Sequence, residues 1–79
     1  MNEIRNKQAS SPFSVLTPRE RDVMAYVMQG EPNKRIAATL GVSQRTVEAH
    51  RARIFRKMQV RNAVQLTHRV LTWPTESSH

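Results

Sequence analysis

The chain has 79 residues, of which 38% are hydrophobic and none is cysteine. This length allows one small domain, and the composition excludes disulfide bonds and thiolate metal sites. No apolar run approaches the roughly 20 residues that span a bilayer, and the first residues lack the apolar segment of a secretory signal. We therefore expect a cytoplasmic protein without a membrane partner.

The positive charge is concentrated in one segment. Residues 33–61 contain eight lysines and arginines against the single acid Glu48, so this segment carries the whole formal net charge of +7. The rest of the chain holds five basic and five acidic residues and is neutral. Such a concentration on one element is typical of a protein that binds a polyanion, nucleic acid above all and an anionic membrane second.

Residues 1–14 are polar and lack apolar periodicity, which predicts a flexible arm or a linker from an upstream domain. A first helix is expected over residues 17–29. Thr17 is a good N-cap, Pro18 suits the first helical position, and Glu20 completes a capping box. Glu20 is also a candidate partner for a base on the second or third helix. Gly30 ends the helix in the left-handed conformation.

A second helix is expected over residues 33–40 with Asn33 as its cap, and a third over residues 43–58 with Ser43 as its cap. The apolar side of the third helix falls at offsets 0, 3, 7 and 11, which is one helical stripe: Val47, His50, Ile54 and Met58. No second histidine, aspartate or cysteine occurs at the sequence spacing from His50 that a metal site would need. We therefore expect a packed, hydrogen-bonded core histidine and neither metal nor cofactor.

A fourth helix is expected over residues 62–72, with Asn62 as its cap, before a loose tail at 74–79. Trp73-Pro74 ends this helix because a residue before proline avoids the helical region. The small Ala37 allows the second and third helices to cross closely, and Gly41 supplies the turn between them. The sequence thus predicts an all-α, compact four-helix domain over residues 15–73 that contains a helix-turn-helix.

Three segments carry a family resemblance: LTPRERDV (16–23), PNKRIAATLGVSQRTVEAHRARIFRKM (32–58) and QVRNAVQL (59–66). Together they resemble the LuxR-type helix-turn-helix, nearest to the output domains of FixJ/NarL response regulators. The resemblance implies sequence-specific binding of double-stranded DNA by the output domain of a bacterial transcription regulator in a two-component system. In such a fold the third helix enters the major groove.

The resemblance places base reading on Glu48, Ala49 and Ala52. Two alanines let a helix sit deep and contact thymine methyl groups, and Glu48 either accepts from a cytosine amino group or orients a neighbouring arginine. As a plain alternative, Glu48 only offsets excess positive charge. Arginine is the commonest reader of guanine, which makes Arg45 and Arg51 the next candidates.

Contacts to the DNA backbone are expected from the basic and hydroxyl-bearing side chains around this helix, and the resemblance itself puts Thr46 and Lys57 among them. The full set is Asn33, Lys34, Ser43, Gln44, Thr46, Arg53, Arg56 and Lys57. A second apolar strip on the last helix, made of Val64, Thr67 and Leu71, is a candidate dimer seam, with extra core as the alternative. We expect a homodimer on DNA that is weak or monomeric in free solution.

Three other functions can be considered for a small basic chain of this kind. A module like region 4 of a sigma factor would read promoters within RNA polymerase, which is in any case a candidate partner; the Thr-Pro-Arg-Glu start favours the LuxR type. A basic amphipathic membrane helix is disfavoured because the third helix lacks a bulky apolar face. An enzyme is not expected, since the sequence offers no nucleophile–base pair and no carboxylate pair. The operator sequence, the direction of regulation and the regulating signal stay open.

Overall fold

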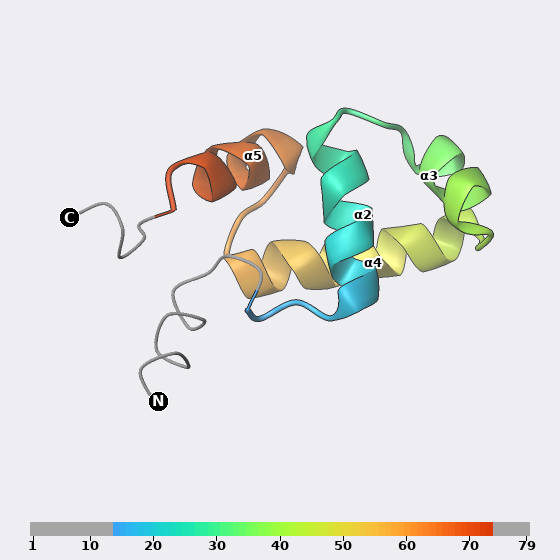
Figure 1. Ribbon diagram of the computed structural model, residues 1–79, viewed down its shortest axis with the longest axis horizontal. Helices are drawn as coiled ribbons and strands as arrows, with labels where there is room; N and C mark the ends of the chain where they lie inside the picture. The colour runs from blue at the N-terminus through green and yellow to red at the C-terminus, as the bar shows by residue number, and fades with distance from the viewer. Residues whose placement is uncertain (1–13, 74–79) are drawn as a thin grey trace, which may run out of the picture.

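A computed structural model describes residues 14–73 (Figure 1). The expected tail at 74–79, and the expected arm at 1–14 except its last residue, lie outside these residues. The described part contains four helices and no strand: α2 (Pro18–Met28), α3 (Asn33–Leu40), α4 (Gln44–Met58) and α5 (Ala63–Leu71). The all-α prediction is confirmed, and each helix agrees with its expected bounds to within one residue at each end.

Three of the predicted N-caps are confirmed. Thr17 Oγ1 accepts from the Glu20 N–H at 3.1 Å, and the Thr17 N–H donates to Glu20 Oε1 at 2.9 Å, which is the full capping box. Ser43 Oγ accepts from the Thr46 N–H at 3.0 Å. Asn62 Oδ1 accepts from the Gln65 N–H at 2.8 Å. Such caps each stabilise a helix by about 1 kcal/mol.

The predicted cap at Asn33 is wrong. Pro32 occupies the N-cap of α3 in an extended conformation (φ −72°, ψ 156°), and no side chain caps the helix. The ring of Pro32 fixes φ near this value, and its carbonyl accepts from the N–H groups of Arg35 and Ile36, both at 3.0 Å. Asn33 is therefore the first helical residue.

Helix α4 is the element on which the other three pack. Helix α2 crosses it, α3 lies beside its N-terminal half, and α5 lies alongside its C-terminal part and against α2 (Figure 1). The predicted stripe is buried at Val47, Ile54 and Met58. These side chains join a core made of Leu16, Val23, Met24, Val27, Ile36, Ala37 and Leu66. Burying each large apolar side chain contributes about 1.5–3 kcal/mol before the entropy of ordering the chain is subtracted.

The helix ends use left-handed residues. Gly30 (φ 84°) follows α2 and Gly41 (φ 72°) ends α3, as the sequence predicted. Gln59 (φ 60°) ends α4 in the same conformation, although it carries a side chain. Val60 then packs partly buried against the core. No helix among the described residues is long and apolar enough to cross a membrane.

Candidate nucleic-acid interface

A tight turn joins α3 to α4. Gly41 takes the left-handed conformation, and the Val42 N–H donates to the Ala37 carbonyl at 3.0 Å. Ala37 itself is 5% exposed and belongs to the core, and α3 packs against α4. The glycine turn and the packing of the two helices give the arrangement of a helix-turn-helix.

The N-terminus of α4 carries two hydroxyl groups that contact each other. Ser43 Oγ lies 3.0 Å from Thr46 Oγ1, besides accepting from the Thr46 N–H. Ser43 and Gln44 are exposed, and Thr46 is half-buried. The first N–H groups of a helix lack intrahelical partners and carry a partial positive charge, so this end suits an anion.

The side of α4 that faces away from the core is small and basic. At 100° per residue, Arg45, Ala49 and Arg56 lie about 160–200° around the helix from the buried Val47. Six exposed residues cover this open face and its two edges: Arg45, Glu48, Ala49, Ala52, Arg53 and Arg56. The two alanines leave a shallow strip between arginines, so a partner can approach the helix backbone closely.

Glu48 is the only acid on α4 and is exposed. Within residues 14–73 the ion pairs join Arg19 to Asp22, Arg35 to Glu31 and Lys57 to Glu20, and none involves Glu48. The expectation that Glu48 orients Arg45 or Arg51 therefore finds no support in the structure. Its carboxylate is free to accept from a partner.

Arg51 lies at the flank of α4, about 40° around the helix from Val47. It is half-buried, and its guanidinium group stands over the ring of Phe55, 5.3 Å from the centroid. This cation–π contact holds Arg51 off the open face, which makes it a weaker candidate for reading bases than Arg45. Sequence reasoning missed the role of Phe55, although an arginine and an aromatic residue four positions apart on a helix would have indicated it.

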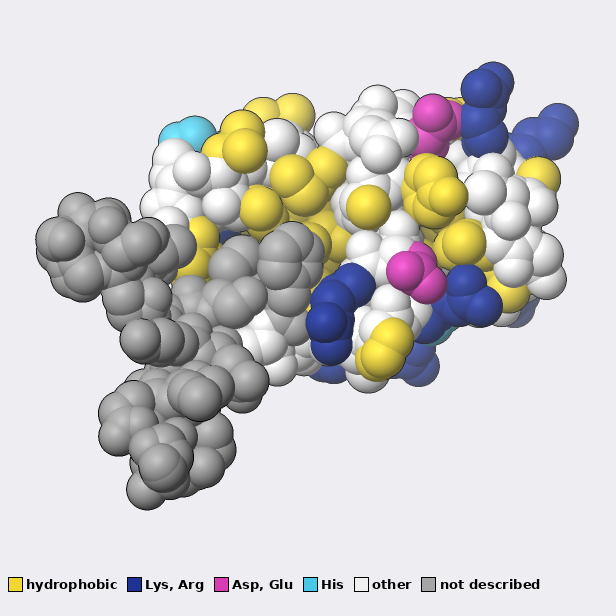
Figure 2. Space-filling model, viewed as in Figure 1, with side chains coloured by type: hydrophobic (Ala, Val, Ile, Leu, Met, Phe, Trp, Pro, Cys, Tyr) yellow, Lys and Arg dark blue, Asp and Glu magenta, His cyan; other side chains and the backbone are white. Residues whose placement is uncertain are grey.

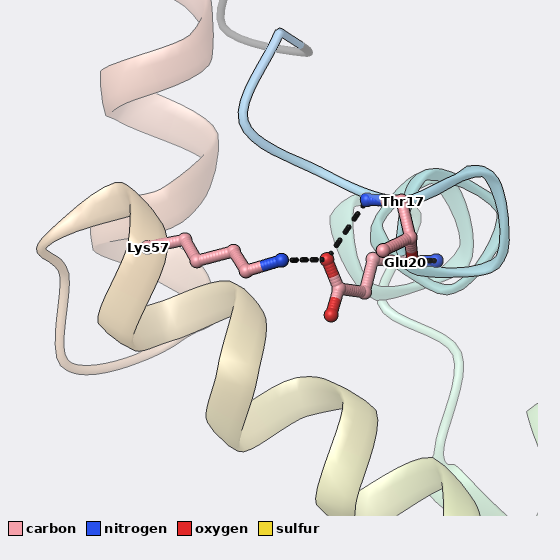
Figure 3. A network of polar contacts seen from close by, with 3 residues as sticks. All are labelled: Thr17, Glu20 and Lys57. Atoms are coloured by element: carbon pink, nitrogen blue, oxygen red, sulfur yellow. Dashed lines mark hydrogen bonds and ion pairs between the residues drawn. The ribbon is translucent and has the colours of Figure 1, made fainter.

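Lys57 is held by a buried carboxylate (Figure 3). Its Nζ lies 2.8 Å from Glu20 Oε1, and the Glu20 side chain is 3% exposed. The expected pairing of Glu20 with a base on another helix is confirmed. Burial raises the pKa of the Glu20 carboxyl group, whereas Lys57 and the Thr17 hydrogen bonds lower it, and the lowering effects prevail. Glu20 is therefore charged at neutral pH.

His50 differs from its expectation in one respect. It is half-buried on the inner flank of α4, and its Nδ1 is buried without a hydrogen-bond partner in the described part of the chain. The predicted packing is present, but the predicted hydrogen bond is absent at this atom. No group of three or more histidines or acids among residues 14–73 is arranged to hold a metal ion.

The two basic residues of helix α3 differ in their ionic pairing. Lys34 is exposed and Asn33 is half-buried. Arg35 pairs with Glu31 at 3.4 Å, which compensates its charge locally. Of the two basic residues on α3, Lys34 is thus the better placed to contact a polyanion.

Helix α5 presents an apolar strip on the outside of the molecule. Val64 is 79% exposed and Leu71 75%, so the alternative that they extend the core is wrong. Thr67 lies between them, and its hydroxyl donates to the Ala63 carbonyl at 3.0 Å. The strip borders a groove of about 480 Å³ that Val27 and Met28 of α2 also line. Figure 2 shows hydrophobic side chains gathered over α5 and its junction with α2.

Known proteins are similar to this chain in sequence and in fold. NarP, a nitrate/nitrite response regulator of Escherichia coli, is 48% identical over 56 residues, which are 71% of this chain and 26% of NarP. The transcriptional regulatory protein UhpA of Salmonella typhimurium is 44% identical over 68 residues, 86% of this chain and 35% of UhpA. The response regulator StyR superposes with a TM-score of 0.75 at 36% identity, covering 91% of this chain and 36% of StyR.

The chain thus spans about a quarter to a third of the length of these relatives. The family described as "Bacterial regulatory proteins, luxR family" matches residues 14–70, which include every described helix nearly in full. Together with the glycine turn between α3 and α4, this match confirms the resemblance noted in the sequence. The chain belongs to the LuxR family of bacterial regulatory proteins.

Proposed function

We propose that this chain is the DNA-binding output domain of a bacterial transcription regulator, with α4 as the recognition helix in the major groove. The observation that carries the proposal is the open face of α4, where exposed Ala49 and Ala52 lie among exposed arginines. The small side chains allow the helix to approach the base edges, and the arginines supply the attraction to phosphate. Membership of the LuxR family supports the same function.

Base reading falls to the residues nearest the middle of the open face. Ala49 and Ala52 contact thymine methyl groups, and Arg45 donates to guanine from the first turn of α4. The unpaired carboxylate of Glu48 accepts from a cytosine amino group. Arg51 takes part only if its guanidinium leaves the ring of Phe55, so we expect it to contribute least.

Contacts to phosphates surround this reading surface. The N-terminus of α4 receives one phosphate through its N–H groups and the side chains of Ser43, Gln44 and Thr46. Arg53, Arg56 and Lys57 follow the backbone along α4. Asn33 and Lys34 reach it from the start of α3.

Pairing on DNA is assigned to α5. Val64, Thr67 and Leu71 form the exposed strip, and the internal hydrogen bond of the Thr67 hydroxyl leaves its methyl group available for packing. A strip of this size is too small for a stable dimer in free solution. We therefore expect two protomers to pair when half-sites about one helical turn apart, ~34 Å, hold them together.

The relatives are named as response and transcriptional regulators, which favours this function over a sigma-factor-like promoter module. Control by an upstream signalling domain, and contact with RNA polymerase, would be properties of a whole regulator of that kind.

Selection of bound sequences from random double-stranded DNA tests the proposal. We expect a two-fold symmetric motif. The Ala49→Glu variant should recover none, because it places bulk and negative charge in the groove. Ala25→Glu is the matched control, since Ala25 is exposed on α2 and the change in net charge is the same. Recovery of no motif by the unaltered chain would refute sequence-specific binding.

A further inference from the structure

The ion pair between Glu20 and Lys57 joins the start of α2 to the last turn of α4 (Figure 3). One oxygen, Glu20 Oε1, accepts from both the Lys57 ammonium group at 2.8 Å and the Thr17 N–H at 2.9 Å. The carboxylate is thereby fixed by the helix cap as well as by burial. The lysine is not enclosed with it, since 35% of its side chain is exposed.

Lys57 belongs to a distinct stripe of α4. Thr46, Arg53 and Lys57 stand at offsets of 0, 7 and 11 residues, so they share one flank of the helix. This flank lies between the buried stripe and the open face. Thr46 is half-buried while Arg53 and Lys57 are exposed. A row of donors along such a flank is suited to following one DNA strand while the open face reads bases.

We propose that Glu20 is a positioning residue for DNA binding. It holds the Lys57 ammonium group at this flank, so that the lysine side chain is already ordered when it meets a DNA phosphate. The inference rests on the proposed function. It makes the phosphate contact of Lys57 depend on Glu20, a residue outside the surface that reads bases. An ammonium group has three N–H donors. Glu20 engages one of them, which leaves donors for a phosphate.

The benefit of positioning is entropic. Lysine has a flexible four-carbon stem, and ordering such a side chain upon binding weakens affinity by about two- to tenfold. In the free protein Glu20 has already restricted Lys57, so DNA binding does not incur this loss. If Glu20 instead withheld Lys57 from DNA, removing the carboxylate would strengthen the contribution of Lys57.

A double-mutant cycle on DNA binding distinguishes these cases. One duplex carrying a selected site is titrated at several salt concentrations with four proteins. These are the full chain, its Glu20→Gln and Lys57→Gln variants, and the variant with both substitutions. Glutamine at residue 20 keeps an oxygen that can accept from the Thr17 N–H. Glu20→Asp, which keeps the charge but draws it back from Lys57, is the second variant. Circular dichroism checks that each variant is folded at the temperature used.

With Glu20 present, we expect Lys57→Gln to weaken binding about two- to tenfold and to reduce the log–log salt slope by about 0.9. With glutamine or aspartate at residue 20, the same substitution should weaken binding less than about twofold. Arg53→Gln is the matched control: it lies on the same flank and makes no ion pair within residues 14–73, so its effect should be equal in all backgrounds.

Three results would overturn the inference. An equal loss in both backgrounds would show that Glu20 has no part in the contact. A greater loss without Glu20 would show competition. An unchanged salt slope after Lys57→Gln would show that the pair only stabilises the fold. The binding of the unaltered chain tests the proposed function separately. If that chain shows no salt-dependent binding, the proposed function fails; if it binds and one of these three results is found, only the role of Glu20 fails.

Discussion

Glu48 poses the sharpest question about a single residue, because it is an acid on a surface proposed to meet a polyanion. Its carboxylate is exposed and has no ionic partner in the described part of the chain. An unpaired acid in the groove repels phosphate, and reading a cytosine amino group would compensate for that repulsion. The alternative is that Glu48 only reduces the positive charge of α4.

Substitution of Glu48 separates the two roles. We predict that Glu48→Lys changes the preferred bases at one position of the selected motif, with a discrimination of about 1–3 kcal/mol against the original base. Glu48→Gln, which keeps the shape without the charge, should relax that position. Selection from random DNA with each variant is the measurement. If Glu48→Lys instead raises affinity equally for all sequences, Glu48 is a charge offset.

Gln59 holds a conformation that favours glycine, with φ at 60°. A residue with a side chain destabilises the fold by about 1 kcal/mol when it adopts the left-handed region, and glycine avoids this strain. Glycine loses more conformational entropy on folding, which offsets part of that gain. We predict that Gln59→Gly stabilises the domain by about 0.5–1 kcal/mol, measured by urea unfolding. Gln29 ends α2 at φ −82°. Gln29→Gly is therefore the control, and a gain there of equal size would contradict the explanation.

At the scale of elements, the Glu20–Lys57 pair makes the packing of α2 on α4 dependent on pH. The folded-state pKa of Glu20 lies below the ordinary value of about 4.5. The unfolded chain therefore binds the proton first as the pH falls. The pair's contribution is complete above the ordinary pKa and is lost as the pH falls through the folded-state pKa.

We predict that urea unfolding between pH 7 and pH 3 shows this loss in the unaltered chain. Glu20→Gln should be less stable at pH 7 and should lose less stability on acidification, because it has no carboxylate to protonate. Asp22→Asn is a control on the same helix, because Asp22 is exposed and its ion pair with Arg19 is long, at 3.7 Å. An acid dependence of Glu20→Gln equal to that of the unaltered chain would exclude Glu20 as its source.

The elements that the sequence predicted well are those fixed by neighbours along the chain. A capping box spans residues 17–20, and a glycine turn needs only Gly41, so local chemistry determines both. The error at Asn33 was also local, because the fixed φ of Pro32 already provides the extended cap. Contacts between distant residues were less predictable. The sequence indicated that Glu20 pairs with some base, but only the crossing of α2 over α4 shows that the base is Lys57.

In the candidate site too, features set by helical periodicity were predictable and side-chain contacts were not. Helical periodicity alone placed Ala49, Ala52 and Arg45 away from the buried stripe, and all three are exposed. Arg51 was proposed from the family resemblance and its residue type, not from periodicity, and its part in base reading stays a prediction. Its contact with the Phe55 ring depends on how a long side chain packs, which periodicity does not give.

At the scale of the whole molecule, the two surfaces proposed to act together are the open face of α4 and the strip on α5. Both are exposed, and the groove beside the strip is formed by α5 with α2, not by α4. Substitutions in the strip should therefore leave the reading of a single half-site intact. Cooperation between the surfaces arises only when two protomers occupy one duplex.

We predict that Leu71→Ser weakens binding to a duplex with two half-sites by at least about tenfold, since each protomer loses the burial of a leucine worth about 1.5–3 kcal/mol. Binding to a single half-site should be unchanged, as measured by titration of the two duplexes under equal salt. Val64→Ser should act in the same direction. Val15 is also exposed, at 49%, but lies outside α5, so Val15→Ser should affect neither duplex. Equal weakening on both duplexes would assign the effect to a damaged fold, and no weakening on either would remove α5 from the interface.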